Sequence, residues 1–169
     1  NLMTPAGEAL KGTPWTVYPR PQLKRESYMN LNGAWDFSVN YEKMGQIRVP
    51  FCPESKLSCI GKHYDEGSLL CYNRIFRLED GFNKGRVILH IGAADQRADV
   101  FLNGKPVGFH KGGYEAFSFD ITDVLTDGEN ILTLCVRDMT EKAPHARGKQ
   151  KLVRKGGMSS LFYTPQSGI

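Results

Sequence analysis

The acidic side chains are the residues of this chain whose chemistry could most directly serve catalysis. Hydrolysis by a general acid and a general base needs two carboxylates that face each other across a cleft. Asp95, Asp99 and Asp138 are the candidates. Asp95 stands in the short connection 93–96, where an aspartate commonly accepts hydrogen bonds from its own turn. Since no motif pairs two of these carboxylates, the sequence predicts no catalytic residue.

The histidines and cysteines do not form a metal-binding pattern. At least two ligands must converge to hold a metal, whereas the four histidines are far apart in the sequence: His63, His90, His110 and His145. The cysteines show neither a Cys-x-x-Cys pair nor a histidine at zinc-finger spacing: Cys52, Cys59, Cys71 and Cys135. Cys71 and Cys135 lie in apolar runs and are interpreted as small core residues. We predict no metal site.

The glycine-rich stretches do not resemble a cofactor cradle. The glycines at 104, 108, 112 and 113 lack the spacing of a dinucleotide or phosphate loop, and no helix follows to present its N-terminus. They are interpreted as turn glycines. The sequence therefore predicts no bound cofactor.

Length and charge limit the class of protein. A chain of 169 residues is expected to form one domain, here 1–169, and no apolar run is long enough to span a membrane. The first residues lack the pattern of a signal peptide, which leaves the compartment unknown, with bacterial cytoplasm and periplasm both possible. From Met139 onward, six lysines and arginines stand against one glutamate. Because this excess lacks helical spacing and an aromatic ladder, we predict a mobile basic loop at 139–157 and no nucleic-acid partner.

Alternating apolar residues predict strands with one buried face. Phe117, Phe119 and Ile121 alternate with polar residues, as do Val87, Leu89 and Ile91. In the stretch 31–37, Trp35 and Phe37 share one face. His90 and His110 fall where the alternation turns them outward. These segments predict an all-β chain.

Turn signals complete the expected architecture. Asn103-Gly104 separates two apolar runs and supplies the positive φ angles that a tight hairpin needs. The nearly continuous apolar run 131–136 indicates a central strand, and 121–125 offers one helical turn. Short strands without intervening helices favour a two-sheet antiparallel β-sandwich of the jelly-roll, galactose-binding-domain-like kind. Residues 1–25, with four prolines, are expected to be irregular.

Longer strings along the chain resemble a known family. They are RPQLKR at 20–25, LNGAWDF at 31–37, VPFCPES at 49–55, YNRIF at 72–76, GAAD at 92–95, VFLNGK at 100–105, GGYEAFSFDIT at 112–122 and SGI at 167–169. In this order they resemble the N-terminal sugar-binding domain of glycoside hydrolase family 2, which includes β-galactosidases, β-glucuronidases and β-mannosidases.

The resemblance implies the chain's place in a larger enzyme. In that family the jelly-roll domain precedes an immunoglobulin-like domain and a (β/α)8 barrel, and the barrel carries both catalytic glutamates. The chain is then a non-catalytic fragment, inactive alone, that packs on the barrel and shapes its pocket for a terminal β-glycoside.

The resemblance also implies which side chains face that pocket. Several family members carry an acidic residue six positions before the glycine of SGI, but Phe162 stands there in this chain. RGKQ at 147–150 is similar to a family segment. The residues expected to face the substrate pocket are Asp138, Arg147, Lys149, Gln150 and Tyr163.

Two other functions remain open from the sequence. A free-standing carbohydrate-binding module would need exposed aromatic rings, for which Trp15, Trp35, Tyr64 and Tyr114 are the candidates. Trp35 is expected in the core. A purely structural interaction sandwich differs from the accessory domain only in whether its loops touch ligand.

Overall fold

The computed structural model describes residues 3–140, 142–146, 150 and 166–169. The strands are β1 (Gly33–Val39), β2 (Glu42–Val49), β3 (Leu69–Phe76), β4 (Ile88–Ile91), β5 (Arg97–Leu102), β6 (Lys105–Lys111), β7 (Phe117–Asp120) and β8 (Asn130–Arg137). The helical pieces are short: α1 (Pro5–Ala9), η1 (Pro21–Leu23), η2 (Lys56–Ser58) and η3 (Thr122–Val124). Within these described ranges no helix has the length and apolarity to cross a membrane.

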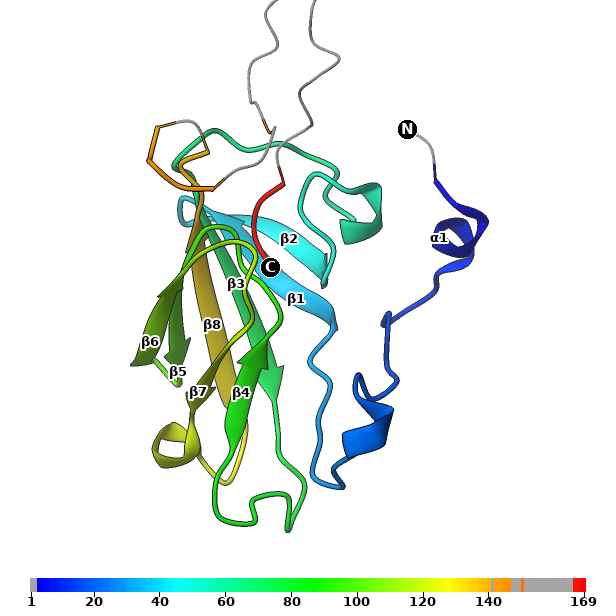
Figure 1. Ribbon diagram of the computed structural model, residues 1–169, viewed down its shortest axis with the longest axis vertical. Helices are drawn as coiled ribbons and strands as arrows, with labels where there is room; N and C mark the ends of the chain where they lie inside the picture. Colours follow the sequence, from blue (N-terminus) through cyan, green and yellow to red (C-terminus); the bar gives the residue numbers. More distant parts are fainter. Residues whose placement is uncertain (1–2, 141, 147–149, 151–165) are drawn as a thin grey trace, which may run out of the picture.

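The strands form two antiparallel sheets. One has six strands in the order β2-β1-β3-β8-β5-β6, and the other pairs β4 with β7 (Figure 1). The inward side chains of both sheets make one core, which includes Trp35 and Phe37 of β1 and Leu89 of β4. The predicted two-sheet antiparallel sandwich is therefore confirmed.

Strand β8 occupies the centre of the large sheet, as the run 131–136 predicted. It pairs with β3 on one side and β5 on the other. Leu132, Leu134 and Val136 are fully buried, whereas Ile131 is exposed. The apolar run therefore buries only one of its two faces, because the second sheet covers only the inner side.

The hairpin between β5 and β6 turns at Asn103-Gly104, as predicted. Both residues have positive φ, 54° and 75°. The Asn103 side chain donates hydrogen bonds to the Val124 carbonyl at 2.9 Å and to Oδ1 of the buried Asn130 at 2.8 Å. The turn is thus tied to the start of β8.

We expect Gly104→Val to lower the free energy of unfolding by about 1–3 kcal/mol, through strain at the left-handed backbone. No atom lies within 4 Å of a Cβ at this position, so crowding adds nothing. Gly128→Val is the matched control, because Gly128 is equally open and does not need a positive φ. Urea unfolding of both variants checks this, and equal losses would contradict it.

Strand β6 departs from the predicted alternation. The register with β5 shifts between Val100 and Phe101, which leaves Val107 without a partner. The extra residue moves the following side chains of β6 to the opposite face of the sheet. His110 therefore lies opposite Ala98 and stacks on Phe117 at 4.2 Å, on the inner face rather than the predicted outer one. Gly108 is a strand residue and not a turn glycine, because a Cβ there would overlap the Phe119 ring of β7.

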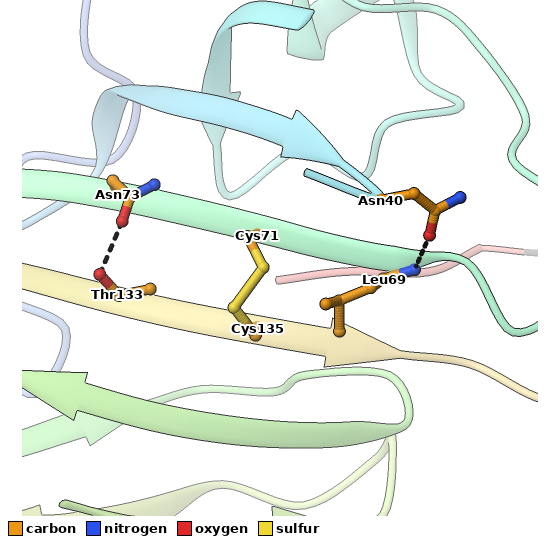
Figure 2. Close-up of a disulfide and its surroundings, with 6 residues drawn as sticks. All are labelled: Asn40, Leu69, Cys71, Asn73, Thr133 and Cys135. Carbon is orange, nitrogen blue, oxygen red and sulfur yellow. Dashed lines mark hydrogen bonds between the residues drawn. A yellow bond between two sulfur atoms is a disulfide. The ribbon is translucent and has the colours of Figure 1, made fainter. Parts of the chain in front are cut away.

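Cys71 and Cys135 form a disulfide between β3 and β8, so interpreting them as plain core residues was wrong. They face each other across the two strands, with Cα atoms 4.2 Å apart (Figure 2). Their neighbours Leu70, Tyr72, Leu134 and Val136 point into the core, which places the disulfide on the outer face of the large sheet. Two pairs further along, Thr133 Oγ1 donates to Asn73 Oδ1 at 2.6 Å.

Residues 3–28 form an arm that precedes β1. It contains α1 and η1 and is otherwise irregular. In Figure 1 the arm runs beside the sandwich rather than within it.

Candidate functional site

Candidate functional residues lie together at one end of the sandwich. The β2–β3 connection, the exit of β8 and the C-terminal residues meet there and line a small pocket that is open to solvent. We call it the end pocket. It is lined by Glu54, Tyr64, Asp65, Glu66, Ser68, Leu70, Asp138, Thr140 and Ser167.

Asp138 lines the end pocket directly after β8. Its side chain is only 9% exposed, and its oxygens accept hydrogen bonds from the Thr140 amide at 2.7 Å and the Thr140 hydroxyl at 2.6 Å. His145 Nε2 lies 3.7 Å from Oδ1. The carboxylate thus holds the turn that follows β8, in the way aspartates organise turns.

The basic segment begins by pairing with an acid of the pocket. The Lys142 amide donates to Glu66 Oε1 at 2.8 Å, and the Lys142 ammonium lies 3.4 Å from Oε2. Lys142 is largely exposed while Glu66 is not. The pair therefore fixes the first turn of the basic segment on the pocket rim.

Glu54 and Asp95 hold the C-terminal residues. Glu54 accepts hydrogen bonds from the Ser167 hydroxyl at 2.9 Å and from its amide at 3.4 Å. The Asp95 and Gly168 backbones exchange two hydrogen bonds, of 2.8 and 3.1 Å. A side chain at Gly168 would overlap the Tyr72 hydroxyl, so the segment packs directly on the core.

Asp95, a candidate carboxylate that the sequence analysis assigned to its own turn, is a titratable group with a shifted pKa at this end. Burial, together with the negative charges of Asp138 and Glu54, raises its pKa to about 7. Its carboxylate lies close against Gly113. The sequence carried no sign of this, because the three carboxylates come from segments distant along the chain.

The raised pKa of Asp95 predicts that stability falls as pH rises from about 4 to about 7. The folded state holds its proton in a range where the unfolded aspartate has lost it, so deprotonation favours unfolding. Asp95→Asn should flatten this part of the pH profile. Urea unfolding across that range checks it, with the exposed Asp123→Asn as control. A slope that survives in Asp95→Asn would contradict the prediction.

Gln150 is the second predicted residue that the structure describes. Its side-chain amide donates to the Tyr114 hydroxyl at 3.2 Å, and its Oε1 accepts from the Gln166 amide at 2.8 Å. It therefore joins the β6–β7 loop to the residues that precede Ser167. The other expected pocket residues, Arg147, Lys149 and Tyr163, lie outside the described residues.

The four aromatic candidates for sugar stacking differ in how far their side chains are exposed. Trp35 is buried, as expected, and its indole donates to the Leu31 carbonyl at 2.7 Å. Tyr64 is half-buried and packs edge-on to Phe37. Trp15 and Tyr114 are exposed. Among the described side chains, no group of three or more His, Cys, Asp or Glu residues is placed to hold a metal ion.

Comparison with known proteins decides the family. The family described as glycosyl hydrolases family 2, sugar binding domain, matches residues 60–146, just over half of the chain. The chain belongs to this family. The matched segment carries β3 to β8, the disulfide, Asp95 and Asp138.

Similar proteins are much longer than this chain. A β-glucuronidase of Bacteroides fragilis is 30% identical over 102 residues, which are 59% of this chain and 15% of that protein. A β-galactosidase of Thermoanaerobacter pseudethanolicus is 28% identical over 115 residues, 67% of this chain and 16% of its own. The solved structure of Bifidobacterium dentium β-glucuronidase complexed with coumarin-3-O-glucuronide matches with a TM-score of 0.53 and 32% identity, covering 63% of this chain and 19% of that one. The chain thus spans less than a fifth of each of these proteins.

Proposed function

We propose that this family 2 sugar-binding domain is the N-terminal, non-catalytic part of an exo-glycosidase that releases terminal β-linked sugars. The family match over 60–146 carries the proposal. The partners are an immunoglobulin-like domain and a (β/α)8 barrel of the same polypeptide. The barrel supplies the catalytic glutamates, and this domain packs on it and shapes its pocket.

The end of the sandwich supports a pocket-shaping role. Loops from four connections meet there. Side-chain contacts join them, Glu54 with Ser167, Glu66 with Lys142 and Gln150 with Tyr114, beside the backbone pair of Asp95 and Gly168. Loops carried by a rigid sheet are where binding residues concentrate. Gln150 and Tyr114 also carry the amide and hydroxyl groups that form hydrogen bonds with sugars.

Assays with nitrophenyl β-galactoside, β-glucuronide and β-mannoside test the assignment. The full-length polypeptide should hydrolyse at least one of them, and its preference identifies the sugar. The 169-residue chain should show no turnover above buffer, because its catalytic partner is missing. Activity that purifies with this chain alone would overturn the proposal. Tight sugar binding by the isolated chain would favour a free-standing carbohydrate-binding module.

Replacing Arg147 and Gln150 with alanine in the full-length protein should lower kcat/KM by roughly tenfold, mainly through KM, as expected for lost hydrogen bonds to substrate. Gln150 lies outside the hydrophobic core, so the melting temperature should barely change. Alanine at Arg77 and Gln46, which are exposed elsewhere on the domain, provides the matched control. Unchanged kinetics would reduce the domain's role to a structural one.

A further inference from the structure

Asp95 and Gln96 lie in the connection between β4 and β5 and hold two other segments at the end of the sandwich. The Asp95 backbone exchanges its two hydrogen bonds with Gly168, among the C-terminal residues. The Gln96 carbonyl accepts a hydrogen bond of 2.9 Å from the Gly112 amide, in the loop between β6 and β7. This connection is therefore the common support of the β6–β7 loop and of the C-terminal residues.

Gln150 joins the same two segments through its side chain. Its amide donates to the hydroxyl of Tyr114 in the β6–β7 loop, and its Oε1 accepts from the Gln166 amide. Tyr114 is two residues from Gly112, and Gln166 is two residues from Gly168. The position of Gln150 therefore depends on both segments staying in place on the connection that contains Asp95.

The Asp95 carboxyl lies directly against the backbone of the β6–β7 loop. A Cβ on Gly113 would stand 2.6 Å from Cγ of Asp95, so only glycine fits there without movement. Among the described residues, none donates a hydrogen bond to this carboxyl. Because the carboxyl is partly buried and lacks a donor, its charged form is costly in this position.

Asp138 and Glu54 are the charged groups that face Asp95. Each already accepts hydrogen bonds from a neighbouring hydroxyl and a backbone amide. In the described part of the chain, His145, at 3.7 Å from Asp138, is the one basic group that pairs with any of the three carboxyls. Loss of the Asp95 proton therefore places a third negative charge among groups that repel it.

Four other titratable groups lie on the strands next to Asp95: Tyr72 of β3, Arg97 of β5, and His110 and Lys111 of β6. Arg97 is already paired with Asp99 at 2.7 Å, and Lys111 stands opposite Arg97 on the outer face of the large sheet. Tyr72 and His110 point into the core. Burial and the two neighbouring carboxylates therefore act unopposed, and they raise the pKa of Asp95 to about 7.

We propose that Asp95 is a positioning residue for Gln150, and that its uncharged carboxyl keeps the β6–β7 loop and the C-terminal residues closed on the connection between β4 and β5. Loss of the proton as the pH passes through neutrality loosens both segments, and with them the Gln150 side chain. The consequence for substrate binding rests on the proposed function, which places Gln150 at a sugar pocket. The loosening itself does not depend on that function.

Amide hydrogen exchange of the full-length polypeptide at pH 6 and pH 8 tests the loosening. Four amides report on it, because each donates a hydrogen bond within the held segments: Asp95, Gly112, Gln166 and Gly168. If Asp95 regains its ordinary pKa when the segments open, the opening equilibrium should rise roughly tenfold between these pH values, after correction for intrinsic exchange. The Asn103 amide, which donates to the Ile131 carbonyl at the other end of the sandwich, should show no such rise.

Asp95→Asn should abolish this rise, because the asparagine side chain has the same size and carries no charge at either pH. Glu115→Gln removes a charge from an exposed position of the same loop, and it should keep the tenfold rise of the parent. A rise that persists in Asp95→Asn would overturn the proposal, and so would a parent protein without any rise.

Gly113→Ala tests the contact separately from the charge. Its methyl group would overlap the Asp95 carboxyl, so the four amides should exchange at pH 6 at least as fast as those of the parent at pH 8. Gly92→Ala is the matched control, because no atom lies within 4 Å of a Cβ at that position. Exchange in Gly113→Ala that stays as slow as in the parent at pH 6 would contradict the proposal, because the loop would then not rest on Asp95.

Kinetics of the same preparations test the link to Gln150. For a nitrophenyl glycoside that the enzyme hydrolyses, the KM of the parent divided by the KM of Asp95→Asn should rise severalfold from pH 6 to pH 8, whereas the ratio of the kcat values should stay constant. When both proteins also carry Gln150→Ala, the KM ratio should no longer depend on pH, because the positioned side chain is gone. A KM ratio that is constant in an active enzyme with intact Gln150 would refute the positioning role.

The two assays separate this proposal from the proposed function. An active enzyme in which the four amides exchange alike in the parent and in Asp95→Asn refutes the role of Asp95 alone. A protein that hydrolyses none of the three nitrophenyl glycosides, but shows exchange that depends on Asp95, refutes the proposed function and leaves the loosening supported.

Discussion

Tyr72→Ala is expected to lower the free energy of unfolding by about 3–5 kcal/mol, the range for removing a buried aromatic ring. Tyr72 lies in β3, between β1 and β8 in the large sheet, and has no exposed surface. Its ring packs 5.0 Å from that of Phe37. Its hydroxyl end lies beneath Gly168, so the loss would also loosen the C-terminal residues from the core. Urea or thermal unfolding measures the effect.

Tyr41→Ala provides the matched control, because the same atoms are removed from a side chain that is 88% exposed. It should change stability by no more than about 0.5 kcal/mol. Tyr72→Phe keeps the ring and removes only the hydroxyl, and it should retain most of the stability. Similar losses in Tyr72→Ala and Tyr41→Ala would mean that β3 is not packed as described.

Local signals account for the parts of the fold that the sequence predicted. A strand buried on one side must alternate, so Trp35 and Phe37 could be assigned to the core from their spacing alone. The turn at Asn103-Gly104 requires positive φ at two successive residues, which few dipeptides tolerate. Neither inference depends on knowing which strands are neighbours.

Features that depend on strand neighbours or on register could not be predicted. A single extra residue at Val107 turns His110 inward, and nothing in the alternating pattern marks that bulge. Cys71 and Cys135 pair only because β8 lies beside β3 with one particular register. Gly108 leaves room for the Phe119 ring of β7, a contact that its position in the sequence does not indicate.

The candidate site likewise combines features that the sequence predicted with features that depend on the three-dimensional structure. The resemblance places Asp138 at a substrate pocket; in the structure it lines the end pocket, and its contact with a substrate stays a prediction. Asp95 was a candidate carboxylate, but its raised pKa could not be predicted, because it depends on burial and on charges from two other connections. Trp15 was considered only for stacking on sugar. Its backbone conformation and the hydrogen bond that Asn30 donates to its carbonyl are visible only in three dimensions.

Reduction of the Cys71–Cys135 disulfide should lower the free energy of unfolding by about 2–4 kcal/mol. The two cysteines are 64 positions apart, so the cross-link restricts a large part of the unfolded chain. In the folded state β3 and β8 stay paired along eight positions without it, so the reduced domain should keep its fold. Urea unfolding with and without a phosphine reductant measures the difference, and Cys71→Ala should reproduce the reduced value.

The two other cysteines make the control for this experiment. Burial raises the pKa of Cys52 to about 11, which keeps it a thiol near neutral pH, and Cys59 is exposed and free. A Cys52→Ala, Cys59→Ala double variant should therefore lose the same stability on reduction as the parent, whereas Cys71→Ala should lose nothing further. If reductant leaves the parent's unfolding midpoint unchanged, β3 and β8 are held by pairing and packing alone, and the outer face of the large sheet carries two thiols instead of a cross-link.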